Sequence, residues 1–196
     1  MTLPTFITGV SKNESAKRGI ATHTVMQFCD FVRMKRDGIK KELDRLLLLE
    51  FISEEDIKRV RTDELERFLS SPLFDEITGG AKLYRELRFN AKLPAEKFAA
   101  DPDRKAALSG NEVLVQGVID CIIENEDGSL HLIDYKTDRL TKEELKNPTL
   151  AEERLRKSHT LQLSYYCDAI KTMFGKMPDK VGVYSLHLGR EVEIFI

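Results

Sequence analysis

Cysteine is scarce in this sequence, with three residues among 196. Cys29, Cys121 and Cys167 lie far apart, and no two of them form a Cys-x-x-Cys pair. This spacing excludes the disulfide framework of small secreted domains, and it offers no ligand set for zinc or an iron–sulfur cluster. We therefore predict three buried free thiols.

Long apolar runs are also absent. No segment approaches the roughly 18 apolar residues that a membrane-spanning helix needs, and the start, MTLPTFITGV, lacks the basic and long apolar stretches of a secretory leader. The composition, with 41% hydrophobic and 33% charged residues, is typical of a soluble globular protein. We expect one domain over residues 1–196, cytoplasmic and without a membrane partner.

An excess of positive charge is the third missing feature. The 31 lysines and arginines are balanced by 33 aspartates and glutamates, which gives a formal net charge of −2. The chain as a whole therefore does not attract nucleic acid, and this counts against an autonomous, high-affinity DNA-binding protein. The net charge does not count against an enzyme that receives its nucleic-acid strand from a partner protein.

The first segment with clear periodicity predicts a helix. Apolar residues between positions 14 and 37 follow helical spacing, with Ser11 or Asn13 as the N-cap and Gly38 as the stop. This helix carries His23.

The next segment, residues 39–78, predicts several short helices. Its apolar residues recur at three- and four-residue spacing, and the pattern restarts at Ser53 and at Thr62, where acidic residues follow as in a first helical turn. We interpret residues 39–78 as a small helical subdomain and residues 79–196 as the sheet with its flanking helices.

Strand patterns dominate the middle of the chain. Residues 82–93 alternate well enough for a strand, and residues 94–111 have no period and predict a mobile loop. Residues 112–124 and 129–137 are rich in β-branched side chains and are joined by the turn sequence Asn-Glu-Asp-Gly, which predicts a hairpin.

The last third predicts two helices and two strands. Thr141 with Glu144 forms one capping box, and Thr149 with Glu152 forms a second, which opens a long helix running to about Phe174. The tail KVGVYSLHLGREVEIFI then predicts two strands. The whole order is that of an α/β or α+β domain.

The hairpin holds three charged residues among apolar neighbours: Asp120 in its first strand, and Asp134 and Lys136 in its second. Because side chains alternate along a strand, Asp134 and Lys136 share one face. A two-residue turn would direct Asp120 away from that face. A three-residue loop with Gly128 in the left-handed conformation would place Asp120 directly opposite Asp134, and we predict this arrangement.

Two facing carboxylates and a lysine can support phosphodiester hydrolysis. Cross-strand Cβ atoms lie about 4.5–5.5 Å apart, so Asp120 and Asp134 could bind one small divalent cation. The cation would polarise the phosphate and activate water, and Lys136 would stabilise the developing charge. The alternative is a buried salt bridge that only stabilises the core, and an Asp-x-Lys motif alone does not distinguish the two.

At these residues the sequence resembles the PD-(D/E)xK nucleases, and among them the RecB-like nuclease domain that closes the AddA subunit of bacterial AddAB helicase-nucleases. Five motifs occur in the family's order: GIATHTVMQ, RELRF, GVIDC, LIDYKTD and QLSYY. The resemblance implies a restriction-endonuclease-like α/β fold, in which a mixed central sheet is flanked by helices. Residues 39–78 would be a small helical insertion.

The resemblance implies a metal ligand set and a catalytic lysine. Asp120 and Asp134 would bind the metal, with the backbone carbonyl of Tyr135 and the side chain of His23 as further ligands. Lys136 would be the catalytic lysine.

Three further residues match family motifs. Gln162 and Tyr166 would steady the site or the DNA strand, although packing alone could explain them, and Glu86 would add an accessory carboxylate. Three histidines match no motif and are interpreted as structural: His131, His159 and His187.

The resemblance also implies cofactors and partners. Mg²⁺ would be the cofactor, with Mn²⁺ able to substitute. Some relatives carry an iron–sulfur cluster built from cysteines beyond the Q-x-x-x-Y motif, but only Cys167 follows Tyr166 here, so no cluster is expected. The substrate would be DNA, delivered as single strands by a helicase motor with its partner subunit.

The implied function is exonucleolytic processing of double-strand break ends in the bacterial cytosol. The sequence lacks the G-x-x-x-x-G-K-[ST] loop that binds ATP, so it looks like an excised or separately encoded C-terminal domain. The alternative is a catalytically silent domain that binds a DNA strand or docks within such a complex. The intact Asp120, Asp134 and Lys136 favour the enzyme.

Overall fold

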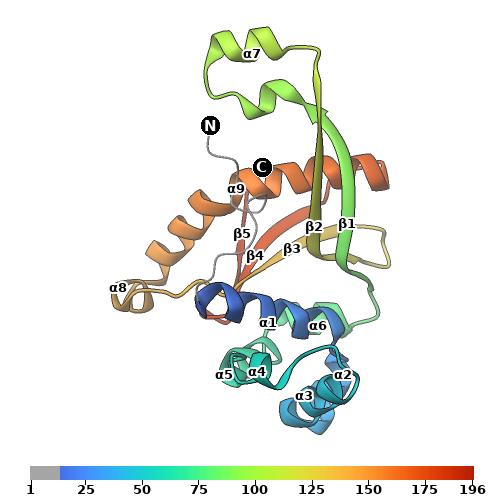
Figure 1. The fold of residues 1–196 in the computed structure, drawn as a ribbon, viewed down its shortest axis with the longest axis vertical. Coiled ribbons are helices and arrows are strands. Elements are labelled where there is room, and N and C mark those ends of the chain that lie inside the picture. The colour runs from blue at the N-terminus through green and yellow to red at the C-terminus, as the bar shows by residue number, and fades with distance from the viewer. Residues whose placement is uncertain (1–13) are drawn as a thin grey trace.

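The computed structural model describes residues 14–196, so both N-caps predicted for the first helix, Ser11 and Asn13, lie outside the described residues. A central sheet separates two helical layers (Figure 1). Short helices from the first part of the chain cover one face, and a long helix from the last third covers the other.

The first predicted helix is in fact two helices, α1 (Glu14–Phe28) and α2 (Phe31–Asp37). Asp30 interrupts the helix, because its side chain accepts a hydrogen bond from the amide of Arg33 at 2.9 Å and caps α2. The prediction of one continuous helix was therefore wrong, and the helical spacing of apolar residues hid an N-cap inside the pattern.

The helical subdomain contains the short helices that the sequence predicted: α3 (Ile39–Leu48), α4 (Glu54–Ile57), α5 (Thr62–Phe68) and α6 (Pro72–Thr78). Ser53 caps α4, as predicted, by accepting from the Asp56 amide at 3.1 Å. Thr62 does not cap α5. It is the first residue of that helix, and Arg61 occupies the cap position without a side-chain hydrogen bond.

The described residues form a sheet of five strands arranged in sequence order: β1 (Lys82–Pro94), β2 (Glu112–Glu124), β3 (Leu130–Lys136), β4 (Lys180–Ser185) and β5 (Arg190–Glu193). All neighbours are antiparallel except β3 and β4, which are parallel. The parallel pair requires a crossover, which the helices between β3 and β4 provide. The sheet is thus mixed and flanked by helices, as the α/β restriction-endonuclease-like prediction required.

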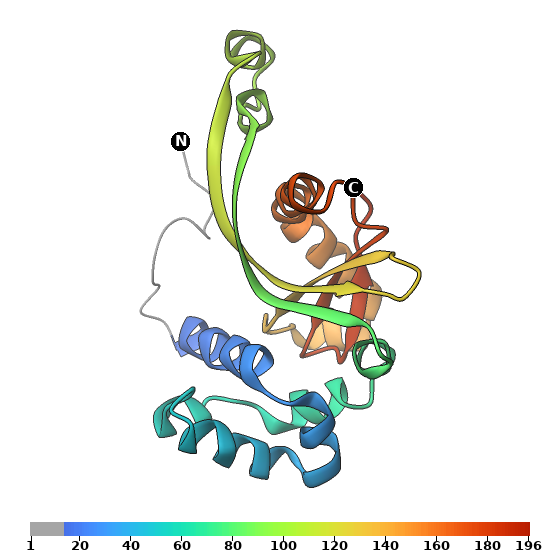
Figure 2. The same cartoon turned by 90° about the vertical axis from the view of Figure 1, so that its right-hand side faces the viewer.

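Strands β1 and β2 form a long hairpin arm that extends beyond the other strands (Figure 2). Its tip holds a 3₁₀ turn, η1 (Ala95–Phe98), and the exposed helix α7 (Pro102–Leu108). The prediction of an aperiodic loop over 94–111 was wrong here. Asp101 caps α7 through the amides of the next turn, and Pro102 at the first helical position needs no hydrogen-bond partner.

The capping box that precedes α8 (Lys142–Lys146) is confirmed, with the Thr141 amide donating to Glu144 at 2.7 Å. The second predicted box does not form. Helix α9 (Pro148–Phe174) starts two residues earlier, with Asn147 in place of Thr149 at the N-cap and proline at its first position, and it ends before Gly175 as predicted. Among the described helices, none is long and apolar enough to cross a membrane.

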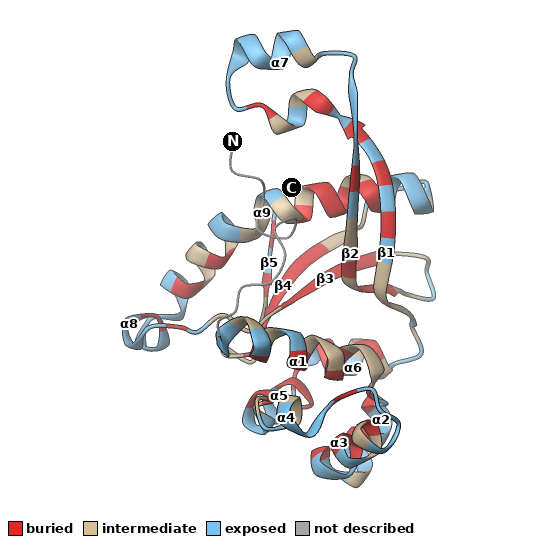
Figure 3. Cartoon of the chain, viewed as in Figure 1, coloured by how far each residue is buried: buried red, intermediate tan, exposed pale blue. Residues whose placement is uncertain are grey.

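Each face of the sheet has its own core (Figure 3). One core joins α1–α6 to side chains of β2, β3 and β4 such as Cys121, Ile133 and Tyr184. The other joins α9 to all five strands through residues such as Ile122, Leu163 and Val183. Strand β3 therefore carries buried side chains on both faces, and the charged residues on it are placed in the middle of the molecule.

Candidate metal centre

The loop of the β2–β3 hairpin has the predicted three-residue form. The amide of Asn125 donates to the Ser129 carbonyl at 3.0 Å, and the amide of Gly128 donates to the Asn125 carbonyl at 2.8 Å. Gly128 has a φ of 79°, a left-handed conformation that side chains disfavour. The loop fixes the register of the two strands.

This register pairs Cys121, next to Asp120 on β2, with Ile133, next to Asp134 on β3. The regular pairing between β2 and β3 ends at this pair, before Asp120 and Asp134. The amide of Tyr135 donates instead to the Asp120 carboxylate, with 2.8 Å between N and Oδ2. Asp120 thus lies at the fork where β2 leaves β3.

Regular pairing between β1 and β2 also lapses at Asp120. Arg85 pairs with Cys121 and Leu87 pairs with Ile119, while Glu86, between them, has a φ of 51°. A left-handed conformation costs a glutamate about 1–2 kcal/mol. Strain of this kind persists where the surrounding structure enforces it, often at functional sites. The left-handed conformation of Glu86 places its carboxylate next to the carboxylate of Asp120.

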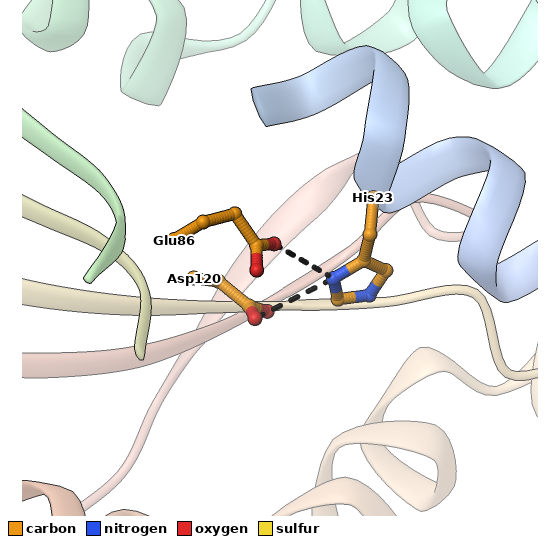
Figure 4. A group of neighbouring side chains, drawn as sticks. All are labelled: His23, Glu86 and Asp120. Carbon is orange, nitrogen blue, oxygen red and sulfur yellow. Dashed lines mark ion pairs between the residues drawn. The ribbon is translucent and has the colours of Figure 1, made fainter. Parts of the chain in front are cut away.

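His23 approaches both carboxylates from helix α1 (Figure 4). Its Nδ1 lies 3.4 Å from Oδ1 of Asp120 and 3.7 Å from Oε1 of Glu86. One ligand atom of each of these three residues lies within 4.8 Å of the other two. Two carboxylate oxygens and one imidazole nitrogen fit a small divalent cation such as Mg²⁺ or Mn²⁺.

Strong electrostatic coupling holds this group together. Burial favours the neutral imidazole, but the charge and hydrogen bonding of Asp120, together with hydrogen bonding to Glu86, prevail and raise the pKa of His23 to about 10. Burial likewise disfavours the charged form of the Asp120 carboxylate, yet His23, Lys136 and the Tyr135 amide together lower its pKa. The imidazolium therefore supplies a positive charge between the two carboxylates.

Asp134 contacts Lys136 and does not belong to the group around His23. The Oδ2 atom of Asp134 lies 2.6 Å from the lysine Nζ, but it has no well-aligned hydrogen bond within residues 14–196. Burial raises the pKa of Asp134 against the attraction of Lys136. Burial also opposes the charged ammonium, but Asp134 and Asp120 raise the pKa of Lys136. Asp134 and Lys136 therefore form a largely buried ion pair.

The structure places the other predicted site residues around this fork. Tyr135 reaches the centre through its backbone amide, while its ring is buried in the core with α1–α6. On α9, Gln162 donates to the Tyr166 hydroxyl at 2.8 Å. Burial and then the negative charge of Asp134 raise the pKa of Tyr166, so this hydroxyl lies within electrostatic reach of the site.

One motif residue without chemistry of its own, Phe89, packs against Tyr166, and a second, Gly117, leaves room for the Phe89 ring. The ring of Phe89 meets the ring of Tyr166 edge-on, with 5.7 Å between centroids. A Cβ atom at Gly117 would lie 2.7 Å from the Phe89 ring, so only glycine leaves room for it. The glycine of GVIDC, the phenylalanine of RELRF and the second tyrosine of QLSYY thus form one contact.

From the sequence, Glu86 was expected to have only an accessory role, and the structure groups it with His23 and Asp120. The histidines outside the motifs contact acidic residues. His131 lies between Glu76 and Glu191, with 2.9 Å to an oxygen of each. The three cysteines are free and buried, as predicted.

Comparison with known proteins gives a consistent result. The family model of the PD-(D/E)XK nuclease superfamily matches residues 4–193. One relative, an ATP-dependent helicase/nuclease subunit from Bacillus licheniformis, is 36% identical over 182 residues, which cover 92% of this chain and 14% of that protein. Subunits of the same name from Heliobacterium modesticaldum and Clostridium perfringens are each 32% identical, over 97% and 92% of this chain and 13% and 14% of their own lengths. The chain thus spans about one seventh of the length of these relatives.

Proposed function

This chain belongs to the PD-(D/E)XK nuclease superfamily, and we propose that it is a Mg²⁺-dependent nuclease domain that hydrolyses the phosphodiester bonds of DNA. The observation that carries the proposal is the group of His23, Glu86 and Asp120, whose ligand atoms lie within 4.8 Å of one another. The ammonium of Lys136 acts on both His23 and Asp120. A cation site beside a fixed positive charge is what phosphodiester hydrolysis requires.

His23, Glu86 and Asp120 would hold the cation. Asp134 and the backbone carbonyl of Tyr135 are proposed as further ligands from β3. When bound, the ion polarises the scissile phosphate and lowers the pKa of the attacking water. Mn²⁺ would substitute for Mg²⁺, because it accepts an imidazole ligand more readily.

Lys136 is the proposed catalytic lysine. Its ammonium stays protonated because Asp134 and Asp120 outweigh burial and raise its pKa. The contact of 2.6 Å with Asp134 fixes its position. A charge held in place in this way stabilises the negative charge that develops on the phosphate oxygens. Gln162 and Tyr166, hydrogen-bonded to each other on α9, would steady the site or the strand.

The relatives are named as subunits of ATP-dependent helicase/nucleases. We extend the proposal to the whole assembly: this domain is the exonuclease part of such a complex. It would receive single strands from a helicase motor with its partner subunit, and it would process double-strand break ends in the bacterial cytosol. This route of delivery accounts for a net charge of −2 on a DNA enzyme.

The test is the cleavage of end-labelled single-stranded DNA with and without Mg²⁺. Asp134→Asn removes a buried charge at nearly constant volume, and we expect a loss of about 100-fold or more in rate. Asp127→Asn makes the same chemical change in the exposed loop of the same hairpin, and it should cleave like the parent.

Three outcomes contradict the proposal. They are cleavage that persists in Asp134→Asn, cleavage that does not need a divalent cation, and no cleavage at all by a parent protein that binds the strand. The last outcome would favour the catalytically silent strand-binding domain.

A further inference from the structure

A second charged feature shares helix α1 with the metal centre. Helix α1, the segment from α4 to α5 and the segment after β3 enclose a cleft of about 410 Å³. Five cationic side chains line it: Arg18, Lys58, Arg59, Arg61 and Arg139. The only acidic side chain that lines it within residues 14–196 is Glu14. The cleft is therefore locally basic on a chain that is slightly acidic overall.

Two of the five cations have partners in ion pairs. Arg59 makes ion pairs with Glu14, Glu55 and Asp56, and Nη1 of Arg61 lies 3.9 Å from Oε1 of Glu64. In contrast, the exposed side chains of Lys58 and Arg139 make no ion pair or hydrogen bond within residues 14–196. Cations of this kind repel one another unless an anion lies between them.

Arg18 is the buried member of the cleft, with 6% of its surface exposed. Its Nη2 donates to the carbonyl of Thr137, but its Nε has no hydrogen-bond partner in the described part of the chain. Burial is the main cause that lowers its pKa, and the like charges of Arg61 and Arg139 add to it against the attraction of Glu64 and Asp138. The buried Nε–H of this guanidinium lacks an acceptor.

The backbone connects the cleft to strand β3, which carries the proposed catalytic lysine. Thr137, whose carbonyl accepts from Arg18, directly follows Lys136, and Arg139 is two residues further on. One short segment thus joins the proposed catalytic lysine to the cleft. The guanidinium groups also indicate that the ligand of the cleft is a phosphate, since arginine binds phosphate through paired N–H donors.

We infer that the cleft formed by Arg18, Lys58, Arg61 and Arg139 binds a backbone phosphate of the DNA strand whose neighbouring phosphodiester lies at the metal centre. The inference rests on the proposed function and adds a strand-positioning site to it. Arg18 holds the floor of the cleft in place, and the exposed Lys58 and Arg139 supply its accessible charge. The site recognises the charge of the backbone phosphate and not the base sequence.

The experiment measures binding of a fluorescent single-stranded oligonucleotide without terminal phosphates, in EDTA, by anisotropy at several salt concentrations. Lys58→Ala/Arg139→Ala is the test variant, and both side chains are exposed, so the fold is preserved. The control is Lys40→Ala/Lys171→Ala, which removes the same charge from exposed lysines on α3 and α9 outside the cleft.

The slope of log K against log salt should fall in magnitude by about 0.7 in the test variant, the value for one phosphate contact on a single strand. The control should keep the slope of the parent. Equal slopes in the test and control variants overturn the inference, whether or not the protein cleaves DNA.

A cleavage assay in Mg²⁺ separates the two proposals. If the parent cleaves and the test variant keeps both its binding slope and its KM, the cleft is not a strand site while the nuclease assignment stands. If the test variant shows the expected loss of salt slope but neither the parent nor the variant cleaves DNA, the cleft remains a strand-binding site and the nuclease assignment fails.

Discussion

At the scale of single residues, His23 would govern how the proposed metal centre accepts a cation. Without metal, its pKa of about 10 means that the imidazole is protonated near neutral pH and forms ion pairs with Asp120 and Glu86. A nitrogen that carries a proton cannot coordinate a metal. The incoming cation must therefore displace a proton, and it takes over the charge that the imidazolium supplied.

This exchange predicts a pH dependence of metal affinity. Since the pKa of His23 is raised to about 10, the proton competes at every lower pH. The apparent affinity for Mg²⁺ should then rise about tenfold per unit between pH about 7 and about 9. Calorimetry in buffers of different ionisation enthalpy should count close to one proton released. Binding that releases no proton would show that His23 is not a ligand.

Removal of the imidazole should affect the two metal ions unequally. We expect His23→Ala to lose more activity in Mg²⁺ than in Mn²⁺, because Mn²⁺ binds more tightly to the ligands that remain. Excess Mn²⁺ should restore part of the cleavage rate. The measurement is the rate at limiting and at saturating concentrations of each ion, and equal rates for parent and variant at limiting metal would refute the ligand role.

At the scale of elements, the β2–β3 hairpin shows what the sequence can define. The turn residues select the three-residue loop, and the loop selects the register that pairs Cys121 with Ile133. Each step is local along the chain. The loop and the register of this hairpin could therefore be predicted from the sequence.

The position of Glu86 could not be predicted in this way. The connection between β1 and β2 is long and holds η1 and α7, so no turn sequence defines the register of these strands. The left-handed conformation of Glu86 also has no signature in a glutamate. The break at Asp30 was missed for a related reason: a side-chain cap interrupted a helix whose apolar spacing continued.

The packing between β1, β2 and α9 gives a prediction at this scale. Gly117→Ala would place a Cβ 2.7 Å from the Phe89 ring and force the ring away from Tyr166. We expect a loss of stability of about 1–3 kcal/mol, measured by denaturant unfolding. Phe89→Leu should relieve the clash, so the double variant should be more stable than the sum of the two single effects. Strictly additive effects would contradict the contact.

At the scale of the whole molecule, the centre lies where three parts of the fold meet. Helix α1 supplies His23, and the β1–β2 arm supplies Glu86 and Asp120. Strand β3 supplies Asp134 and Lys136. The helical subdomain packs with α1 against the sheet in one core, and this packing fixes the distance between His23 and the strands. The order of the sequence motifs predicted the participants, and tertiary packing determines which of them touch.

The central claim is that the fork between β2 and β3 holds a divalent cation. The most direct test is anomalous X-ray scattering from crystals of the protein grown with Mn²⁺. We predict a single strong peak about 2.0–2.3 Å from oxygens of Asp120 and Glu86 and from the Nδ1 atom of His23. Crystals that show Mn²⁺ elsewhere, with the imidazole of His23 still in contact with Asp120 and Glu86, would contradict the account.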